Sequence, residues 1–310
     1  MSKRQIIIDT DPGQDDAVAI LLALASPEVE VLGITAVAGN VPLSLTQKNT
    51  RIVCELAGRT DLKVFAGCDA PLTRKLITAE HVHGQTGLDG PAMPEPIMPL
   101  QDAHAVDFII ETVRATDGVT LCPLGPLTNI ASALQKAPDI ASRIRELVLM
   151  GGAYFEVGNI TPSAEFNIYV DPEAADIIFK SGTPITVMPL DVTHKALTTQ
   201  SRMDAFRDMG TPVGEAVAAW TDFFNRFDME KYTSPGAPLH DPCVIAYLID
   251  PDLFTGRHVN VCIETTSNLT LGMTVADWWG VTDRAPNAMF MGDINADGFF
   301  DLLTRRIATL

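Results

Sequence analysis

The segment IIIDTDPGQDDAVAILLAL, at residues 6–24, decides how the start of this chain folds. Residues 6–8 are apolar and β-branched, as in a buried strand, whereas residues 17–24 form an apolar run typical of a helix. Pro12 and Gly13 between them indicate a turn. The segment therefore predicts a strand, a turn and a helix, the first unit of an open α/β sheet. Ligands bind at the carboxyl ends of the strands in such sheets.

The turn of this unit carries four aspartates within eight positions, Asp9, Asp11, Asp15 and Asp16. Like charges this close repel one another, and carboxylate oxygens are the ligands that calcium and magnesium prefer, so the cluster favours a divalent cation. Asp15 or Asp16 can alternatively cap the helix by accepting backbone N–H bonds. Capping explains one carboxylate well and four poorly. Successive helical residues project about 100° apart, so these two can serve different partners, an ion and a ligand hydroxyl.

The composition limits the class of protein. The chain has 310 residues, of which 46% are hydrophobic and 20% are charged, enough to bury a large core. Low-complexity linkers and internal repeats are absent from the sequence, so we expect a single domain over residues 1–310. A formal net charge of −17 repels nucleic acids and anionic membranes and favours a neutral or cationic small-molecule substrate.

The N-terminal residues predict neither secretion nor a membrane span. Lys3 and Arg4 resemble the start of a signal peptide, but the apolar stretch after them is short and ends at Asp9. The five cysteines are scattered, odd in number and without metal-ligand spacing, which is typical of a reducing cytoplasm. We therefore expect a cytoplasmic protein.

Apolar β-branched runs alternate with helical runs along the first two thirds of the chain. Predicted strands lie at 29–37, 63–66, 119–124, 146–150 and 185–190, and predicted helices at 43–57, 103–115, 129–135 and 173–180. This alternation predicts an α/β fold with a mostly parallel, doubly wound, Rossmann-like sheet and helices on both faces. From Ser201 onward the pattern is less regular. Helices are expected there at 212–227, 243–248 and 296–307, and strands at 258–264 and 269–275.

A set of motifs in order along the chain resembles the signature of the nucleoside hydrolases, also called ribonucleoside or inosine-uridine hydrolases. The motifs are residues 9–17 (DTDPGQDDA), Ala38-Gly39-Asn40, His83-Gly84 with Gly87-Leu88, residues 125–129 (GPLTN), Met150-Gly151-Gly152, Glu165-Phe166-Asn167 with residues 171–175 (DPEAA), and His240-Asp241-Pro242. One departure is Asp89, an additional acid in the loop after His83. The resemblance covers nearly the whole chain, and it implies hydrolysis of ribonucleosides to ribose and free base, as in nucleoside salvage.

Cleavage of an N-ribosidic bond leaves an oxocarbenium-like ribosyl group, so the site must hold the ribose, deliver water and ease departure of the base. A cation that binds both the ribose diol and the nucleophilic water performs two of these tasks, because it holds the ribose and delivers the water. Asp11, Asp16 and Asp241 can supply carboxylates, and the turn at 126–128 can supply a carbonyl. With two diol hydroxyls and a water, this set suits calcium better than the stricter octahedron of magnesium. The resemblance implies the same ion and ligands, with Thr128 binding through its carbonyl.

Aspartate precedes proline four times in this chain, which offers an internal comparison. Asp171 is followed by Pro172 and an acid, the pattern of a helix N-cap, so we assign it to structure. Asp241 also precedes an apolar helical run and can be a cap as well. The resemblance favours a metal ligand at Asp241.

Sugar recognition needs groups that donate and accept hydrogen bonds, and amides suit that role. The resemblance implies that the ribose contacts come from Asp15, Asn40, Asn159, Glu165 and Asn167. Asn159 on its own is equally typical of a turn. Met150 and Phe166, which lie in the same motifs, are expected to border the substrate.

His83 and His240 are the candidates for the acid that protonates the leaving base, and Tyr232 is a candidate for the base pocket. A loop histidine is ordinarily solvated, but the glycines within residues 84–90 suit a lid that closes over the substrate. The resemblance links a histidine at the position of His240 to activation of the base in members that are not purine-specific, so uridine or inosine is the expected substrate. Asp11 is the expected general base toward the metal-bound water. The remaining histidines, His104, His194 and His258, are expected to be structural.

Two other classes of protein share parts of this pattern. An aspartyl phosphotransferase of the haloacid dehalogenase type also begins with a strand and an Asp-x-Asp motif, but it needs Thr or Val where this chain has Gly13. A non-catalytic calcium- or ribose-binding protein would need neither a water-activating carboxylate nor a histidine beside the base. Release of free ribose with and without a chelator separates the three. We also expect a homo-oligomer, either a dimer or a tetramer.

Overall fold

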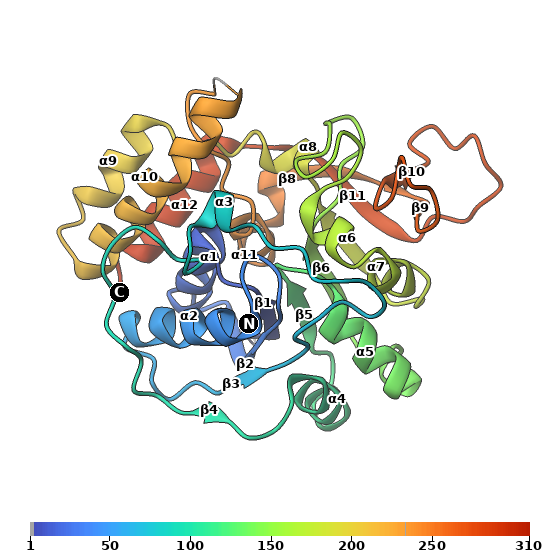
Figure 1. Ribbon diagram of the computed structural model, residues 1–310, viewed down its shortest axis with the longest axis horizontal. Coiled ribbons are helices and arrows are strands. Elements are labelled where there is room, and N and C mark those ends of the chain that lie inside the picture. Colours follow the sequence, from blue (N-terminus) through green and yellow to red (C-terminus); the bar gives the residue numbers. More distant parts are fainter. Residues whose placement is uncertain (1–2, 233) are drawn as a thin grey trace.

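A nine-stranded sheet forms the centre of the computed structural model, which describes residues 3–232 and 234–310, without the side chains of 228–232 (Figure 1). The strands are β1 Arg4–Thr10, β2 Val29–Ala36, β3 Val64–Ala66, β4 Leu100–Gln101, β5 Thr120–Pro123, β6 Glu146–Met150, β7 Ile185–Met188, β8 Phe254–Val259, β9 Val261–Ile263, β10 Thr274–Ala276 and β11 Ala288–Ile294. The helices are α1 Gln14–Leu24, α2 Leu43–Leu56, α3 Glu80–His83, α4 Ala105–Ala115, α5 Thr128–Lys136, α6 Phe166–Val170, α7 Pro172–Phe179, α8 Leu190–Thr193, α9 Gln200–Arg207, α10 Pro212–Tyr232, α11 Pro242–Ile249 and α12 Ala296–Ile307, with short 3-10 turns at Pro138–Ile140 and Pro251–Leu253.

The order of the strands explains where a ligand can bind. The sheet runs β4-β3-β2-β1-β5-β6-β7-β11-β8, and β8 alone in it pairs antiparallel, with β11. The chain moves outward from β1 to β4 on one side and then from β5 toward β11 on the other. The order therefore reverses between β1 and β5. Such a switch point leaves a crevice at the carboxyl ends of the two strands.

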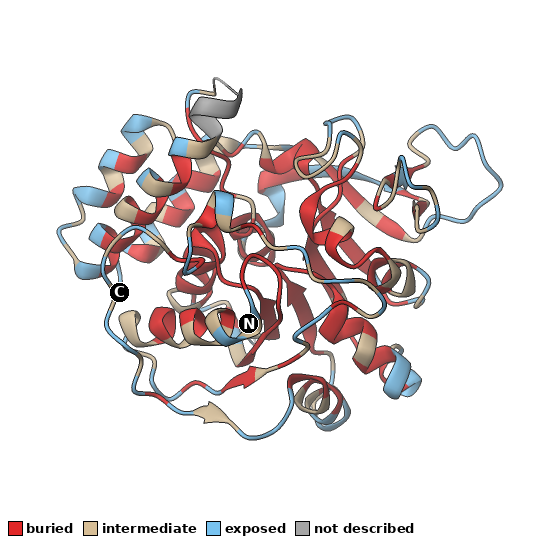
Figure 2. Cartoon of the chain, in the orientation of Figure 1, coloured by how far each residue is buried: buried red, intermediate tan, exposed pale blue. Residues whose placement is uncertain are grey.

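Strand β1 is buried on both faces of the sheet, as its continuous apolar run predicted. Ile6 and Ile8 belong to one hydrophobic cluster, with side chains from α1, α2, α10, α11 and α12. Ile7 belongs to a second cluster, with side chains from α4, α5 and α7. Figure 2 shows the central strands in the colour of buried residues, with exposed residues on the outer faces of the surrounding helices and loops. The predicted doubly wound α/β architecture is confirmed.

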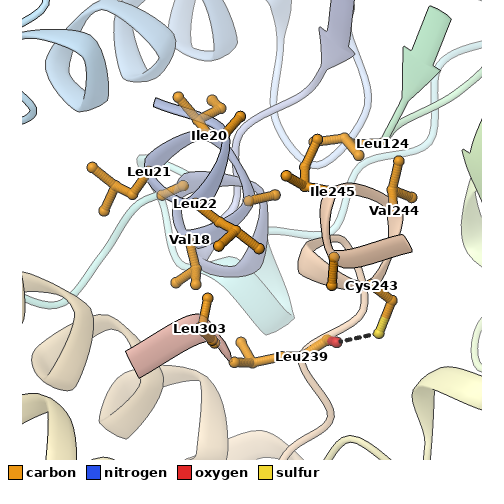
Figure 3. Close-up of a cluster of buried hydrophobic side chains, with 14 of the residues drawn as sticks. Val18, Ile20, Leu21, Leu22, Leu124, Leu239, Cys243, Val244, Ile245 and Leu303 are labelled. Carbon is orange, nitrogen blue, oxygen red and sulfur yellow. Dashed lines mark hydrogen bonds between the residues drawn. The ribbon is translucent and has the colours of Figure 1, made fainter. Parts of the chain in front are cut away.

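Helices α1 and α11 pack side by side, although more than 200 residues of sequence separate them (Figure 3). Val18 and Leu22 of α1 and Val244 and Ile245 of α11 are fully buried members of one hydrophobic cluster. This apolar contact aligns the two helices so that residues at their N-terminal ends come together. The hydrophobic core thereby sets the position of the polar groups that precede each helix.

The predicted elements agree with the structure in the first two thirds of the chain and less well beyond. The predicted strand 258–264 is two strands, because β8 joins the main sheet and β9 pairs antiparallel with β10. The predicted strand 269–275 is extended only from Thr274, at the start of β10. Strand β11 was missed because its sequence, AMFMGDI, contains a single β-branched residue. Helix α9 was missed because it is mostly polar, and β4 because it has only two residues.

Across the part of the chain that the structure describes, every helix is too short or too polar to cross a bilayer.

Candidate active site

Four aspartates from three segments meet at the carboxyl end of β1. Asp11 follows β1, Asp15 and Asp16 lie in the first turn of α1, and Asp241 directly precedes α11. Carboxylate oxygens of Asp15, Asp16 and Asp241 all lie within 4.8 Å of one another. All four residues are buried, and Asp11 is close enough for its charge to act on the others. We call these four residues the acid floor.

Asp11 is enclosed by the loops that follow β2 and β5. Its Oδ2 accepts the backbone N–H of Asn40 at 2.8 Å, and the Asn40 side-chain amide donates to the carbonyl of Asp11 at 3.1 Å. A Cβ atom at Gly39 would lie 2.0 Å from Oδ2, and one at Gly125 would lie 2.1 Å from Oδ1. Glycine at both positions is therefore what lets the two loops close around this carboxylate.

Asp16 caps the helix in which it lies, whereas Asp241 does not cap the helix that it precedes. Asp16 serves α1 as well as the site, because its Oδ2 accepts the N–H of Gly13 at 3.0 Å and its Oδ1 accepts the hydroxyl of Thr10 at 2.5 Å. Asp241 occupies the N-cap position of α11, but within the described residues its side chain makes no capping hydrogen bond and meets the Asp16 carboxyl group instead. The capping explanation thus fails for Asp241. It holds for Asp171, which caps α7 as expected.

Burying these carboxyl groups together changes their acidity. Burial, with the charge of Asp16 beside it, raises the pKa of Asp15 to about 8. Burial and the neighbouring floor charges also raise the pKa of Asp11 and of Asp241 well above the usual range. Carboxylates in this setting are stable at neutral pH only beside a positive charge, and hard divalent cations prefer oxygen ligands. The acid floor therefore fits a divalent metal ion.

Thr128 begins α5, just beyond the loop after β5. Its hydroxyl donates a hydrogen bond to Oδ2 of Asp171 at 2.7 Å, so this oxygen is already engaged. The family resemblance implies that Thr128 binds the ion through its carbonyl.

A pocket opens above the acid floor, and one of its walls consists of hydrogen-bonding groups. The residues predicted from the sequence that line this pocket are Asp15, Asp16, Asn40, Met150, Asn159, Glu165, Phe166, Asn167 and Asp241. Glu165 caps α6 and also accepts the N–H of Gly152 at 2.9 Å. The Asn167 amide donates to the carbonyls of Leu124 at 2.6 Å and Met150 at 3.3 Å. These bonds to neighbouring strand ends hold the wall in place before a ligand arrives.

Asn159 has the turn role that the sequence also allowed. Its Oδ1 accepts the backbone N–H of Phe166 at 2.9 Å, which closes the loop between β6 and α6. Both residues still line the pocket, so this structural role does not remove Asn159 from the site.

The other end of the pocket is lined by rings. This aromatic rim consists of His81, His83, His194, Phe224, Phe227 and His240. The ring centroids of His83 and Phe224 lie 5.4 Å apart, and those of Phe224 and His240 lie 6.5 Å apart. Such a ring-lined space suits a planar group, whereas the acid floor suits an ion and hydroxyls.

His83 is buried, contrary to the expectation of a solvated loop histidine. Its Nδ1 lies 2.7 Å from Oε1 of Gln14, and the Gln14 amide donates to the carbonyls of His83 at 3.0 Å and Asp89 at 2.9 Å. Burial lowers the pKa of His83 to about 3, so the ring is neutral at physiological pH. The loop after α3 therefore packs against Gln14, the first residue of α1.

Asp89, the acid that departs from the family pattern, shapes this loop. Its carboxylate accepts the backbone N–H groups of Gln85 at 3.1 Å and Thr86 at 3.2 Å. Gly84 has a φ of 82°, and a Cβ atom there would lie 2.1 Å from the Asp89 carboxylate. The additional acid thus closes a tight turn whose backbone also binds Gln14.

Two histidines stand together at the rim. Nδ1 of His240 lies 2.7 Å from the hydroxyl of Thr193, and burial lowers the pKa of His240 well below its ordinary value. His194 also lines the pocket, with its ring centroid 5.8 Å from that of His240, so it is not the remote structural residue that we expected. Its position after β7, at the same rim as the other strand ends, was the available signal. Tyr232 ends α10, and its side chain lies outside the described residues.

Sequence reasoning also left the roles of several site residues unassigned. They are Gln14, His81, Phe224 and Phe227. Gln14 lies inside the aspartate cluster, whereas both phenylalanines belong to α10, far from any motif. Only the fold brings α10 over the pocket.

An open α/β sheet with a buried acid floor at its switch point, a hydrogen-bonding wall and a ring-lined end defines a metal-dependent hydrolase site. A family model described as "Inosine-uridine preferring nucleoside hydrolase" matches residues 6–301. The chain belongs to this nucleoside hydrolase family and is a ribonucleoside N-glycosyl hydrolase. The phosphotransferase and non-catalytic alternatives are therefore wrong.

Individual relatives agree with this assignment. The chain is 49% identical to the pyrimidine-specific ribonucleoside hydrolase RihA of Photobacterium profundum, over 98% of this chain and 99% of the relative. It is 48% identical to RihA of Escherichia coli K12, over 97% of each chain. Among solved structures, it resembles the purine-preferring ribonucleoside hydrolase of Gardnerella vaginalis with a TM-score of 0.93 and 35% identity, over 99% of this chain and 98% of the other.

Proposed function

We propose that this enzyme hydrolyses pyrimidine ribonucleosides most efficiently, accepts inosine less well, and depends on Ca²⁺. The observation that carries the proposal is the acid floor, which shares one pocket with hydrogen-bonding side chains and with the aromatic rim. These three regions correspond to an ion, a ribose and a base. Family membership identifies the reaction, and the geometry of the site is the basis on which we assign a task to each residue.

Calcium fits the floor by the chemistry of its donors. Carboxylate oxygens of Asp15, Asp16 and Asp241 lie close enough together to hold one ion. We assign Asp16 and Asp241 to it, together with the neighbouring carboxylate of Asp11 and, by the family resemblance, the carbonyl of Thr128, so that every ligand is an oxygen. With the ribose diol and a water, they reach the six to eight oxygens that calcium accepts. When bound, the ion orients the diol and lowers the pKa of a water.

The residues of the chain perform the remaining tasks. Asp11 accepts the proton of the attacking water, because it is the floor carboxylate that is fixed between two loops. Asp15 binds a ribose hydroxyl, and Asn159, Glu165, Asn167 and Asn40 bind the others. Met150 and Phe166 cover the sugar and exclude water from it.

The base leaves toward the aromatic rim. His240 is the group that we assign to its activation, since Thr193 fixes the ring beside Asp241. His83 is held through its Nδ1 by the amide oxygen of Gln14, and we assign it to positioning of the base. We assign Tyr232 to the same end of the pocket.

The preference for pyrimidines rests on two considerations. The rim combines histidines with phenylalanines, and it contains no tryptophan that would provide a larger stacking surface in the described part of the pocket. The relatives at 48 to 49% identity are named pyrimidine-specific, whereas the purine-preferring structural relative is 35% identical.

A substrate panel tests the proposal. Release of reducing sugar is measured from uridine, cytidine, inosine, guanosine and adenosine, with enzyme stripped by chelator and then supplied with Ca²⁺ or Mg²⁺. We expect uridine and cytidine to be fastest and Ca²⁺ to restore activity better than Mg²⁺. Full activity in the stripped enzyme, or no sugar from any nucleoside, contradicts the proposal. Deoxyuridine should be slower by roughly 10⁴-fold, because loss of the 2′-hydroxyl leaves buried polar groups unpaired.

We further propose that the chain acts as one domain in a cytoplasmic homo-oligomer. Light scattering coupled to size-exclusion chromatography checks the assembly: a mass of two or four chains is expected, and a monomer contradicts it.

A further inference from the structure

The turn that follows β7 contains four consecutive residues, Asp191 to His194, and the last of them lines the pocket. Three of them contact polar groups on other segments. Asp191 is buried, and its carboxylate accepts the backbone N–H groups of Tyr154 at 2.9 Å, Phe155 at 2.6 Å and Glu156 at 3.1 Å. This carboxylate therefore fixes the loop after β6.

The fixed loop presents Glu156 to His194. Oε2 of Glu156 lies 3.1 Å from Nδ1 of His194. A carboxylate only accepts hydrogen bonds, so Nδ1 carries the proton and the ring is held in one orientation. Nε2 is then the nitrogen of His194 that can meet a ligand. One residue earlier, Thr193 holds His240 by its Nδ1 at 2.7 Å, so a single turn orients two imidazoles.

Stability is a poor explanation for the Glu156–His194 pair. The two side chains are 45% and 31% exposed, and ion pairs in contact with water contribute little to folding. Burial of a carboxylate is energetically unfavourable, yet Asp191 is buried and holds the loop that carries Glu156. The carboxylate of Asp191 stabilises the loop, whereas the Glu156–His194 pair adds little stability and orients a histidine that lines the pocket, which indicates ligand recognition.

We propose that His194 is a base-recognition residue of this hydrolase and that Glu156 is its positioning residue. This inference rests on the proposed function, the hydrolysis of ribonucleosides, and it specifies which side chain recognises the base. An imidazole whose Nδ1 is fixed offers Nε2 as an acceptor when neutral and as a donor when protonated. It can thus bind the N–H or the C=O groups along the polar edge of a pyrimidine. His240, beside it, remains the group that activates the base.

The test compares a nucleoside with a riboside that lacks this polar edge. kcat and KM are measured for the nucleoside that the wild type cleaves fastest and for p-nitrophenyl riboside, in His194→Ala, His194→Gln and Glu156→Gln. His258→Ala is the matched control, because His258 is an exposed histidine on β8 that does not line the pocket. Calcium content and melting temperature are recorded for every variant.

We expect His194→Ala to lower kcat/KM for the nucleoside by about 10- to 100-fold, mostly through KM, and for p-nitrophenyl riboside by less than about threefold. His194→Gln should recover part of the loss, because an amide also donates and accepts. Glu156→Gln should show the same selective loss at about 3- to 10-fold, since a neutral amide holds the ring less firmly. His258→Ala should behave as wild type on both substrates.

Equal losses on the two substrates, or wild-type nucleoside kinetics in His194→Ala, overturn the inference and leave the proposed function standing. If His194→Ala does not fold, His194→Gln and Glu156→Gln decide by the same comparison. A wild-type enzyme that cleaves p-nitrophenyl riboside but no nucleoside refutes the base assignment. An enzyme that cleaves neither refutes the proposed function, and the inference with it.

Discussion

The acid floor and the aromatic rim line the same pocket but are built in different ways. Three of the four floor residues lie within six positions of sequence, and the fourth is aligned with them by the packing of α11 on α1. The rim collects residues from α3, from the position after α8, from α10 and from the position before Asp241, and ring contacts join several of them. The floor is thus fixed by the core of the fold, whereas the rim is assembled from side chains of separate helices and turns. Substitutions in the floor should therefore change the rate of the chemical step, whereas substitutions in the rim should change the selectivity among substrates.

Removing a floor carboxylate should have the largest effect. Asp16→Ala or Asp241→Ala takes away one of three acids that lie within 4.8 Å of one another, so we expect loss of bound calcium and a fall in kcat/KM of roughly 10⁴-fold or more. Metal analysis and ribose release measure the two effects. Asp250→Ala is a matched control, because Asp250 also precedes a proline but is exposed. Full calcium occupancy in both floor variants would overturn the ligand assignment.

Asp11→Asn should separate proton transfer from metal binding within the floor. The amide keeps the shape between Gly39 and Gly125 but cannot take a proton, so kcat should fall by about 10²- to 10⁴-fold while much of the calcium stays bound. Steady-state kinetics with metal analysis checks this. A loss of metal as complete as that in Asp16→Ala would make Asp11 a ligand only.

His240→Ala should affect the rim alone. Uridine hydrolysis should slow by roughly 10²-fold, because its base needs activation, whereas p-nitrophenyl riboside has a leaving group that departs without a proton. The ratio of the two kcat values is the measurement. Similar losses for both substrates would show that His240 positions Asp241 or the ribose.

The smallest effect concerns the closed loop and its dependence on pH. The pKa of His83 is about 3 in the folded protein and near 6.5 in an unfolded chain, so the unfolded chain binds more protons between these values. The stability that the neutral, buried ring contributes is present above about pH 6.5 and is lost as the pH falls toward 3. His83→Gln should therefore lose less stability on acidification than the wild type. Melting temperatures from pH 4 to 8 should diverge by a few degrees, and parallel curves would contradict the account.

Local patterns predicted the floor, and three-dimensional packing determined the rim. The contiguous acids, the β-branched run before them and the Asp-Pro pairs could be interpreted because each signal lies within a few residues. His194 gave no such signal, since its partner Glu156 lies 38 positions away in sequence. Phe224 belongs to a long helix whose pattern shows which face is apolar but not what that face covers. Contacts between residues far apart in the sequence produce no periodic pattern from which they could be predicted.

The insertion of β11 between β7 and β8 has a consequence for how the protein is made. Residues 288–294 are synthesised after every floor residue, yet without them β7 is an open edge and β8 has no partner in the sheet. The turn after β7 depends on the same strand, because Lys195 donates to the carbonyl of Gly292 at 2.6 Å and pairs with Asp293 at 2.9 Å. A nascent chain can therefore contain every floor residue while its sheet is incomplete and its apolar edge exposed to aggregation. The support of the turn that carries His194 is therefore complete only after β11 has paired with β7.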